Sequence, residues 1–156
     1  MTNPMGKPLA NPLRSEAARS FAILLARLAL GATLLTFGVA KIGHTGVQNF
    51  VDHFTHYIPS SIPLPIGQTC LYILPFAEVI LGSLLILGLF TRTTACLAAL
   101  MVLTFTLAVT GPVARDTPAD WPYIHPYIVY LALSILLSTT GPGVISLDRR
   151  LHRGKT

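Results

Sequence analysis

Residues 21–40 read FAILLARLALGATLLTFGVA, a segment of 20 residues with a single charged side chain, Arg27. An α-helix rises about 1.5 Å per residue, so a helix of this length spans the roughly 30 Å hydrocarbon core of a bilayer. Only 11% of the chain is charged, whereas 52% is hydrophobic. Because soluble domains carry about 25% charged residues, this composition excludes an ordinary water-soluble protein and a disordered chain.

Three further nearly uncharged segments follow, at residues 70–90, 94–110 and 123–140. Gly111-Pro112 ends the third segment and Gly141-Pro142-Gly143 ends the fourth, because glycine and proline both terminate helices. Only Thr91-Arg92-Thr93 separates the second segment from the third, so these helices must be antiparallel neighbours. The sequence therefore predicts an all-α, integral membrane four-helix bundle.

The longest connection, residues 43–68, contains an amphipathic segment. Its apolar side chains recur at helical spacing, at Val47, Phe50, Val51, Phe54 and Ile58. We expect a short amphipathic helix on the outer face, between the first and second membrane helices. It either lies on the membrane surface or packs as a lid over the mouth of the bundle.

Basic residues favour one side of the predicted membrane. Eight of them precede the first helix, occupy the short connection or follow the last helix, whereas Lys41 and Arg115 lie on the other side. The positive-inside rule then places both termini in the cytoplasm. The expected organisation is a flexible cytoplasmic tail (1–19), a transmembrane domain (20–147) and a basic cytoplasmic tail (148–156). This topology explains the net charge of +5, so no nucleic-acid partner is expected.

Arg27 and Glu78 are ionisable residues inside the predicted spans. Both side chains are costly in hydrocarbon and should face the bundle interior or a wet cavity. Counting from the helix ends puts their backbones at depths roughly 8 Å apart, a gap that an arginine or one water would cross. Alternatively, Arg27 extends to the cytoplasmic headgroups, which the shorter Glu78 side chain does not reach.

Small and aromatic residues accompany these charges. The first helix carries one stripe of charged and small residues, Arg27, Gly31, Gly38 and Lys41. Gly82 follows Glu78 by one turn, and such glycines let helix backbones approach closely. The fourth helix has a polar stripe that is either functional or an interfacial anchor leading into a packing seam, namely Tyr123, Tyr127, Tyr130, Ser134 and Ser138.

His53 and His56 are weak metal-ligand candidates, since their i, i+3 spacing allows joint ligation. No cysteine or second carboxylate completes a metal pattern beside them, so we expect no metal. Cys70 and Cys96 are predicted to lie at opposite ends of their helices, which excludes a disulfide.

Four motifs in order resemble the DoxX family: RLALG (27–31), FGVAK (37–41), EVILGSLLILGLFTR (78–92) and GPGVISLD (141–148). The resemblance extends over residues 20–151. It implies a four-helix membrane bundle with cytoplasmic ends in the inner (cytoplasmic) membrane of a bacterium.

The resemblance also implies a function. Some DoxX-like proteins are membrane components of redox assemblies, and the related DoxD protein is a subunit of a thiosulfate:quinone oxidoreductase. Such a role implies a site for a quinone or lipid-like ligand, lined by Arg27, Lys41, Glu78, Tyr127 and Tyr130. Glu78 is then the candidate to move a proton as the quinone changes redox state. The chain has no haem, flavin or iron–sulfur motif, so a redox partner must supply electrons and the polypeptide alone is not a complete oxidoreductase.

Two other functions fit the same residues. One is a structural or assembly bundle without chemistry, in which Arg27 and Glu78 only fix helix registry. The other is a proton-coupled transporter, for which four helices without a broken-helix pair suffice only in an oligomer. The expected partners are the lipid bilayer, a redox protein and further copies of the chain.

Overall fold

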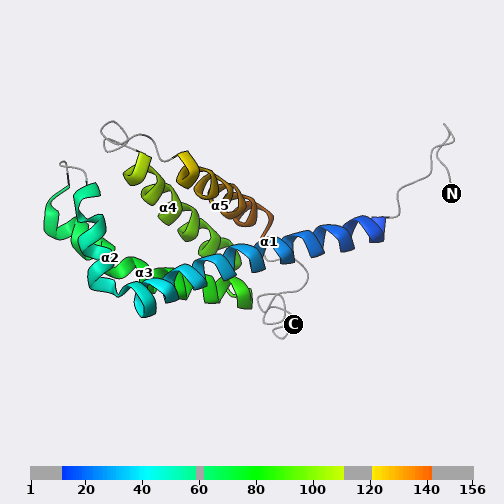
Figure 1. The fold of residues 1–156 in the computed structure, drawn as a ribbon. Helices are drawn as coiled ribbons and strands as arrows, with labels where there is room; N and C mark the ends of the chain where they lie inside the picture. Colours follow the sequence, from blue (N-terminus) through cyan, green and yellow to red (C-terminus); the bar gives the residue numbers. More distant parts are fainter. Residues whose placement is uncertain (1–11, 59–61, 111–120, 142–156) are drawn as a thin grey trace.

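The computed structural model describes residues 12–58, 62–110 and 121–141, and every regular element within them is helical (Figure 1). The elements are α1 (Pro12–Ala40), the π-helical turn η1 (Lys41–Thr45), α2 (Val47–Phe54), the short 3₁₀ turn η2 (Thr55–Tyr57), α3 (Leu64–Leu87), α4 (Thr91–Thr110) and α5 (Trp121–Thr140). The all-α prediction is confirmed for this part of the chain. Each of the four long apolar segments forms a helix, and the amphipathic segment forms α2.

Two helices begin earlier than the sequence predicts. α1 starts at Pro12, so residues 12–19, expected in a flexible tail, belong to this helix. α3 starts at Leu64 and has Pro65 in its first turn, where the missing amide hydrogen of proline is tolerated. The remaining tail residues, 1–11 and 142–156, and the turn at Gly111-Pro112 lie outside the described residues.

The turn between α3 and α4 is not where the sequence analysis places it. Thr91, Arg92 and Thr93 are the first residues of α4, and the connection consists of residues 88–90. Gly88 has a φ of 70°, and its amide and that of Leu89 donate to the carbonyl oxygens of residues 84 and 85. This is a Schellman closure. The prediction was wrong because apolar residues after Gly88 made the span look longer than the helix.

α1 and α3 form an antiparallel pair with very close backbones. A Cβ atom at Gly31 would lie 2.9 Å from the carbonyl oxygen of Gly82, and one at Gly82 would lie 2.6 Å from the amide nitrogen of Leu35. A Cβ at Gly38 would lie 2.7 Å from the carbonyl oxygen of Pro75. The structure confirms that these glycines let the two helices approach, and the resulting register aligns the polar residues of both helices.

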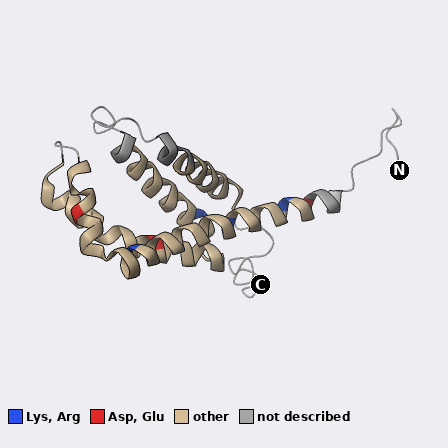
Figure 2. Cartoon of the chain, in the orientation of Figure 1, with Lys and Arg blue, Asp and Glu red and all other residues tan. Residues whose placement is uncertain are grey.

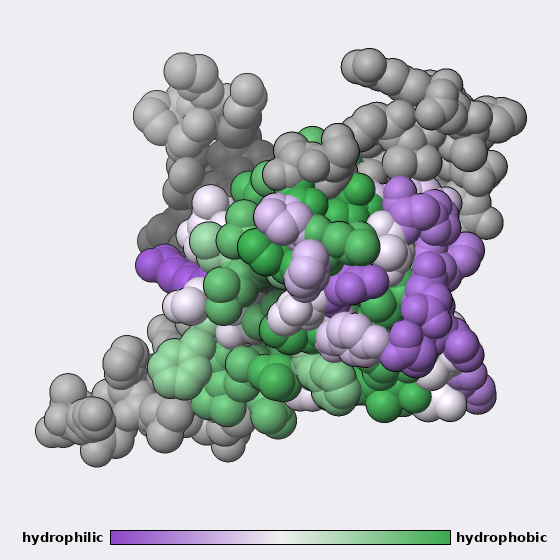
Figure 3. Space-filling view, turned by 90° about the vertical axis from the view of Figure 1, so that its left-hand side faces the viewer, coloured by the Kyte–Doolittle hydropathy of each residue, from purple (hydrophilic) through white to green (hydrophobic). Residues whose placement is uncertain are grey.

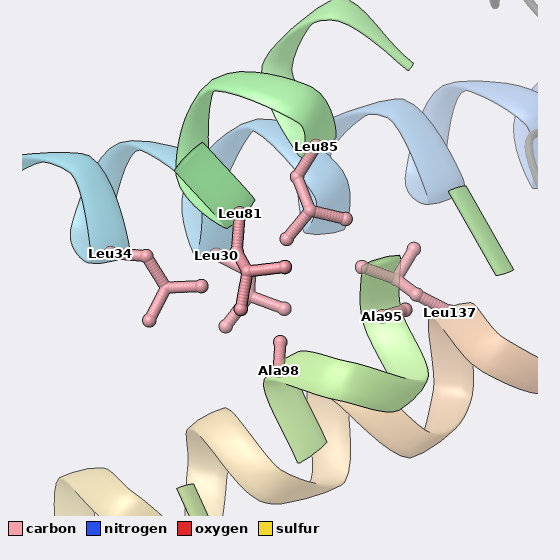
Figure 4. Close-up of a cluster of buried hydrophobic side chains, with 7 residues drawn as sticks. All are labelled: Leu30, Leu34, Leu81, Leu85, Ala95, Ala98 and Leu137. Carbon is pink, nitrogen blue, oxygen red and sulfur yellow. The ribbon is translucent and has the colours of Figure 1, made fainter. Parts of the chain in front are cut away.

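α4 and α5 form a second pair, which meets the first pair where both α1 and α3 contribute leucines (Figures 1 and 4). Leu30 on α1, Leu85 on α3 and Leu137 on α5 are fully buried there. The complete cluster is Leu30, Leu34, Leu81, Leu85, Ala95, Ala98 and Leu137. The alanines of α4 are small enough for this helix to lie close to the leucines of the other pair.

The outer surfaces of the long helices are apolar. Leu100, Leu107 and Ile80 are exposed by 61%, 60% and 58%, which would be unfavourable for so many side chains in water. Figure 2 shows how few charged residues the helices carry, and Figure 3 shows hydrophobic residues over much of the face at the α2 end. Such surfaces suit contact with lipid.

Two helical segments are long and apolar enough to cross a membrane, Glu16–Thr45 and Leu64–Leu87. Thr91–Leu107 and Pro126–Thr140 are shorter apolar helices. Among the described residues, two helices therefore meet the length and hydropathy expected of a membrane span.

Candidate ligand-binding site

A buried ion pair joins α3 to the end of α1. The ammonium of Lys41 donates a hydrogen bond to Oε1 of Glu78 at 2.5 Å, and the two side chains are exposed by only 19% and 8%. Lys41 is the first residue of the π-helical turn η1, a type of element that often occurs at functional sites. Glu78 follows Pro75 by one turn, and the contact between Gly38 and Pro75 holds the two backbones together beside the pair.

Aromatic rings from two other helices lie against the ammonium. Nζ of Lys41 is 4.9 Å from the ring centroid of Phe50 on α2 and 5.8 Å from that of Phe105 on α4. Both distances are within the range of cation–π attraction. The ion pair is thus enclosed by side chains from α2 and α4 as well as by its own helices.

A series of ring contacts extends from α2 to α1 around this pair. The ring centroids of Phe54 and Phe105 are 5.6 Å apart, and those of Phe105 and Tyr127 are 5.3 Å apart. Tyr127 contacts Tyr130 at 6.5 Å, and Tyr130 contacts Phe37 at 6.2 Å. We call the following residues the ion-pair site: Lys41, Glu78, Phe50, Phe105, Tyr127 and Tyr130.

The second carboxylate oxygen of Glu78 is an open acceptor. Oε2 is buried and has no hydrogen-bond partner among the described residues. Leaving a buried polar atom unsatisfied costs about 1–3 kcal/mol, and more when the group is charged. The site therefore offers a strong, uncompensated acceptor to any donor that reaches it.

Arg27 is not part of the ion-pair site. Its guanidinium lies against the end of α3, where a Cβ atom at Gly88 would be 2.6 Å from Nη1. Lys41, not Arg27, is opposite Glu78, and Arg27 lies about 21 Å from Lys41 along α1 at 1.5 Å per residue. The sequence did not identify Lys41 as the partner of Glu78, because the helix ends taken from the sequence do not give the register of α1 against α3.

Burial also decides between the two expectations for the Arg27 side chain. The residue is only 3% exposed, so it faces the protein interior instead of extending to headgroups. A cation at a helix C-terminus is favourable because the last carbonyl groups carry partial negative charge. The C-terminus of α3 therefore stabilises the buried charge of Arg27.

α2 packs as a lid, the second of the two alternatives for the amphipathic segment. Phe50 and Val51 are only 3% and 1% exposed. The Tyr72 hydroxyl on α3 donates to Oε1 of Gln48, and Nε2 of Gln48 donates to Asp52 at 2.9 Å. The apolar face of α2 therefore covers the ion pair, while its polar face is linked to α3.

The two candidate metal ligands on this lid take part in ring packing. The ring centroids of His53 and His56 are 5.8 Å apart, and each histidine also contacts the ring of Tyr57. In the part of the chain that the structure describes, no group of three or more metal-ligating side chains gathers.

The sequence predicts Lys41, Glu78, Tyr127 and Tyr130 as site residues. The structure pairs Lys41 with Glu78, and Tyr127 and Tyr130 follow from the ammonium through the ring of Phe105. The sequence did not identify Phe50 and Phe105 as neighbours of the ammonium. The helical pattern of the outer segment identified Phe50 only as part of an apolar face. Phe105 lies in a uniformly apolar segment, which contains no signal for the side that faces Lys41.

Apolar helices of membrane length around a buried ion pair define a small helical membrane protein. The DoxX family model matches residues 22–111, and the chain belongs to this family. It is also similar to the "Inner membrane protein YphA" of Escherichia coli (strain K12), with 31% identity over 140 residues that cover 86% of this chain and 93% of that protein. No solved structure matches the chain.

Proposed function

We propose that this DoxX-family protein is a membrane subunit of a redox complex and binds the headgroup of a quinone or similar lipid-like ligand at the ion-pair site. The observation that carries the proposal is the buried Lys41–Glu78 pair, which leaves one carboxylate oxygen without a described partner inside an aromatic enclosure. Binding sites for small molecules commonly combine apolar and aromatic walls with a few placed polar groups.

The site has the chemistry that such a headgroup needs. Rings of Phe105, Tyr127 and Tyr130 provide faces and edges for a planar ring. Lys41 and Glu78 supply a donor and an acceptor for the polar atoms of such a headgroup. Because the outer faces of the helices are apolar, an isoprenoid or acyl tail would remain in the bilayer next to them. Electrons would pass to or from a partner protein that carries the redox centre.

The proposal includes a topology of four membrane spans with both termini in the cytoplasm. α4 and α5 have 20 residues each, which is within the spanning range of about 17–25 residues. The excess of basic residues on one side supports this orientation. The inner-membrane location of the similar Escherichia coli protein supports the choice of membrane.

A second candidate function is a structural or assembly bundle. The contact of Arg27 with the end of α3 favours it, because this buried charge has a structural role that needs no ligand. The same reasoning does not extend to Glu78, whose Oε2 has no partner among the described residues.

Purification from native membranes tests the proposed function. Extracted lipids and co-purifying proteins are identified by mass spectrometry for the wild type and for Glu78→Gln. Glu16→Gln is the matched control, since Glu16 is an exposed carboxylate on α1 and lies outside the site.

The expected result is a bound quinone or other aromatic lipid together with a redox protein in the wild type and the control. Glu78→Gln should lose most of the lipid while the purified protein stays folded. Wild-type protein that yields neither an aromatic lipid nor a redox subunit would refute the proposal and favour the structural bundle.

A further inference from the structure

We infer that the ion-pair site selects a lipophilic aromatic ligand that donates a hydrogen bond, a hydroquinone or phenol, over the corresponding quinone or ether. This inference rests on the proposed function and specifies which chemical form of the ligand binds. It follows from the hydrogen-bonding capacity that remains after the protein has made its own contacts.

The donor side of the pair is partly engaged and is flanked by rings. The ammonium of Lys41 donates one hydrogen bond to Oε1 of Glu78 at 2.5 Å, and Nζ lies 4.9 Å and 5.8 Å from the ring centroids of Phe50 and Phe105. A ligand carbonyl that accepted from another N–H of Lys41 would weaken these cation–π contacts, whereas a donor to Glu78 would leave them in place.

The acceptor side is open. Oε2 of Glu78 is buried and has no hydrogen-bond partner in the described part of the chain. A ligand hydroxyl placed there would donate to a charged oxygen without breaking the Lys41–Glu78 contact. A quinone carbonyl at the same place would put two acceptors against each other, and a methyl ether would leave the oxygen unsatisfied.

The walls of the site define the rest of the ligand. Tyr127 contacts the rings of Phe105 and Tyr130. An aromatic ring fits among these side chains better than a sugar or phosphate does. Because Oε2 is buried, a ligand reaches it only when neighbouring side chains move aside.

The test measures binding of three matched probes to the full-length protein in nanodiscs under anaerobic conditions. Decylubiquinol has two donors, decylubiquinone has none, and the dimethyl ether of decylubiquinol keeps the aromatic ring but lacks the donors. For the wild type we expect the Kd of decylubiquinol to be lower than that of either other probe by about tenfold or more.

The Glu78→Gln variant sharpens the test. Its amide can still accept from Lys41 but presents N–H groups where Oε2 was, so this variant should bind decylubiquinol more weakly and lose the preference over decylubiquinone. Comparison of the three probes on the wild type keeps the inference testable if this variant does not fold. Equal affinities of the wild type for all three probes would overturn the donor preference and leave the ligand site standing. Absence of binding by every probe would remove the proposed function and this inference with it.

Discussion

Arg27 lies against Gly88, at the point where α3 ends. A Cβ atom on this glycine would be 2.6 Å from Nη1 of the arginine, and the φ of Gly88 is 70°. The buried guanidinium of Arg27 therefore packs directly against the left-handed residue Gly88. A side chain at position 88 would collide with the arginine. An exposed arginine, Arg92, makes a similar contact at the end of α5, where the φ of Gly141 is 78° and a Cβ atom would be 2.9 Å from Nε.

Gly88→Ala should destabilise the protein strongly. The added methyl group meets Arg27, and a non-glycine residue at this φ costs about 1–2 kcal/mol before any clash is counted. Thermal unfolding in detergent should show a clearly lower midpoint. Gly43→Ala is the matched control, because a Cβ atom at Gly43 meets nothing within 4 Å, and its midpoint should stay close to that of the wild type. Equal midpoints for the two variants would contradict this account of the α3 terminus.

Gly82→Ala should separate α1 from α3. Its Cβ would stand 2.6 Å from the backbone nitrogen of Leu35, and backbone cannot move aside as a flexible side chain can. We expect a loss of about 1–3 kcal/mol, the usual cost of overpacking, measured by unfolding in a denaturing detergent. Ala29→Val adds volume at an exposed position of α1 and should cost less. A tolerated Gly82→Ala would mean that the close contact does not stabilise the helix pair.

Lys41 and Glu78 should be energetically coupled. Lys41→Met leaves a buried carboxylate without its cation, whereas Lys41→Met combined with Glu78→Leu removes both charges. The losses of unfolding free energy in Lys41→Met and in Glu78→Leu should add up to more than the loss in the double variant. The difference, which is the coupling energy, should be about 1–3 kcal/mol. Reversible unfolding of the four proteins gives this value directly. Simple additivity would show that the ion pair contributes no net interaction.

Tyr72→Phe should loosen α2 without unfolding the bundle. It removes the hydroxyl that donates to Gln48, an exposed hydrogen bond worth about 0.5–1.5 kcal/mol. Amide hydrogen exchange should accelerate in Val47–Phe54 and remain unchanged in α4. Tyr57→Phe, which alters a tyrosine in η2, serves as the control. Unchanged exchange in α2 would show that burial of Phe50 and Val51 alone holds the lid.

Sequence patterns predicted the elements better than their contacts. Helix periodicity and apolar length identified α2 and the long helices, because these signals are local. The i+4 spacing of Glu78 and Gly82 and the glycines of α1 predicted close helix packing. The partner of Glu78 depends on the register between two helices, and a shift of one turn moves a contact by about 5.4 Å. The local sequence around Lys41 and Arg27 does not show which of these two cations pairs with Glu78.

The same limit applies to the turn between α3 and α4. Gly88 was available as a helix terminator, but the apolar residues that follow it extended the hydropathic signal to Phe90. The side chain of Phe90 is 71% exposed on the surface of the turn. Hydropathy records where a side chain can face lipid, which is a different property from where the backbone stops being helical.

The two arginine–glycine contacts lie at the same end of the molecule, because Gly88 ends α3 just before α4 begins and Gly141 ends α5 beside Arg92. Contacts at this end join α1 to α3 and α4 to α5. The opposite end carries α2 and the ion-pair site, where aromatic side chains of α2, α4 and α5 contact one another. We therefore expect rearrangement on ligand binding to be larger at the α2 end than at the end formed by the two arginine–glycine contacts. A pair of spin labels on α2 and α5 would report a change in distance that labels near Gly88 and Gly141 would not.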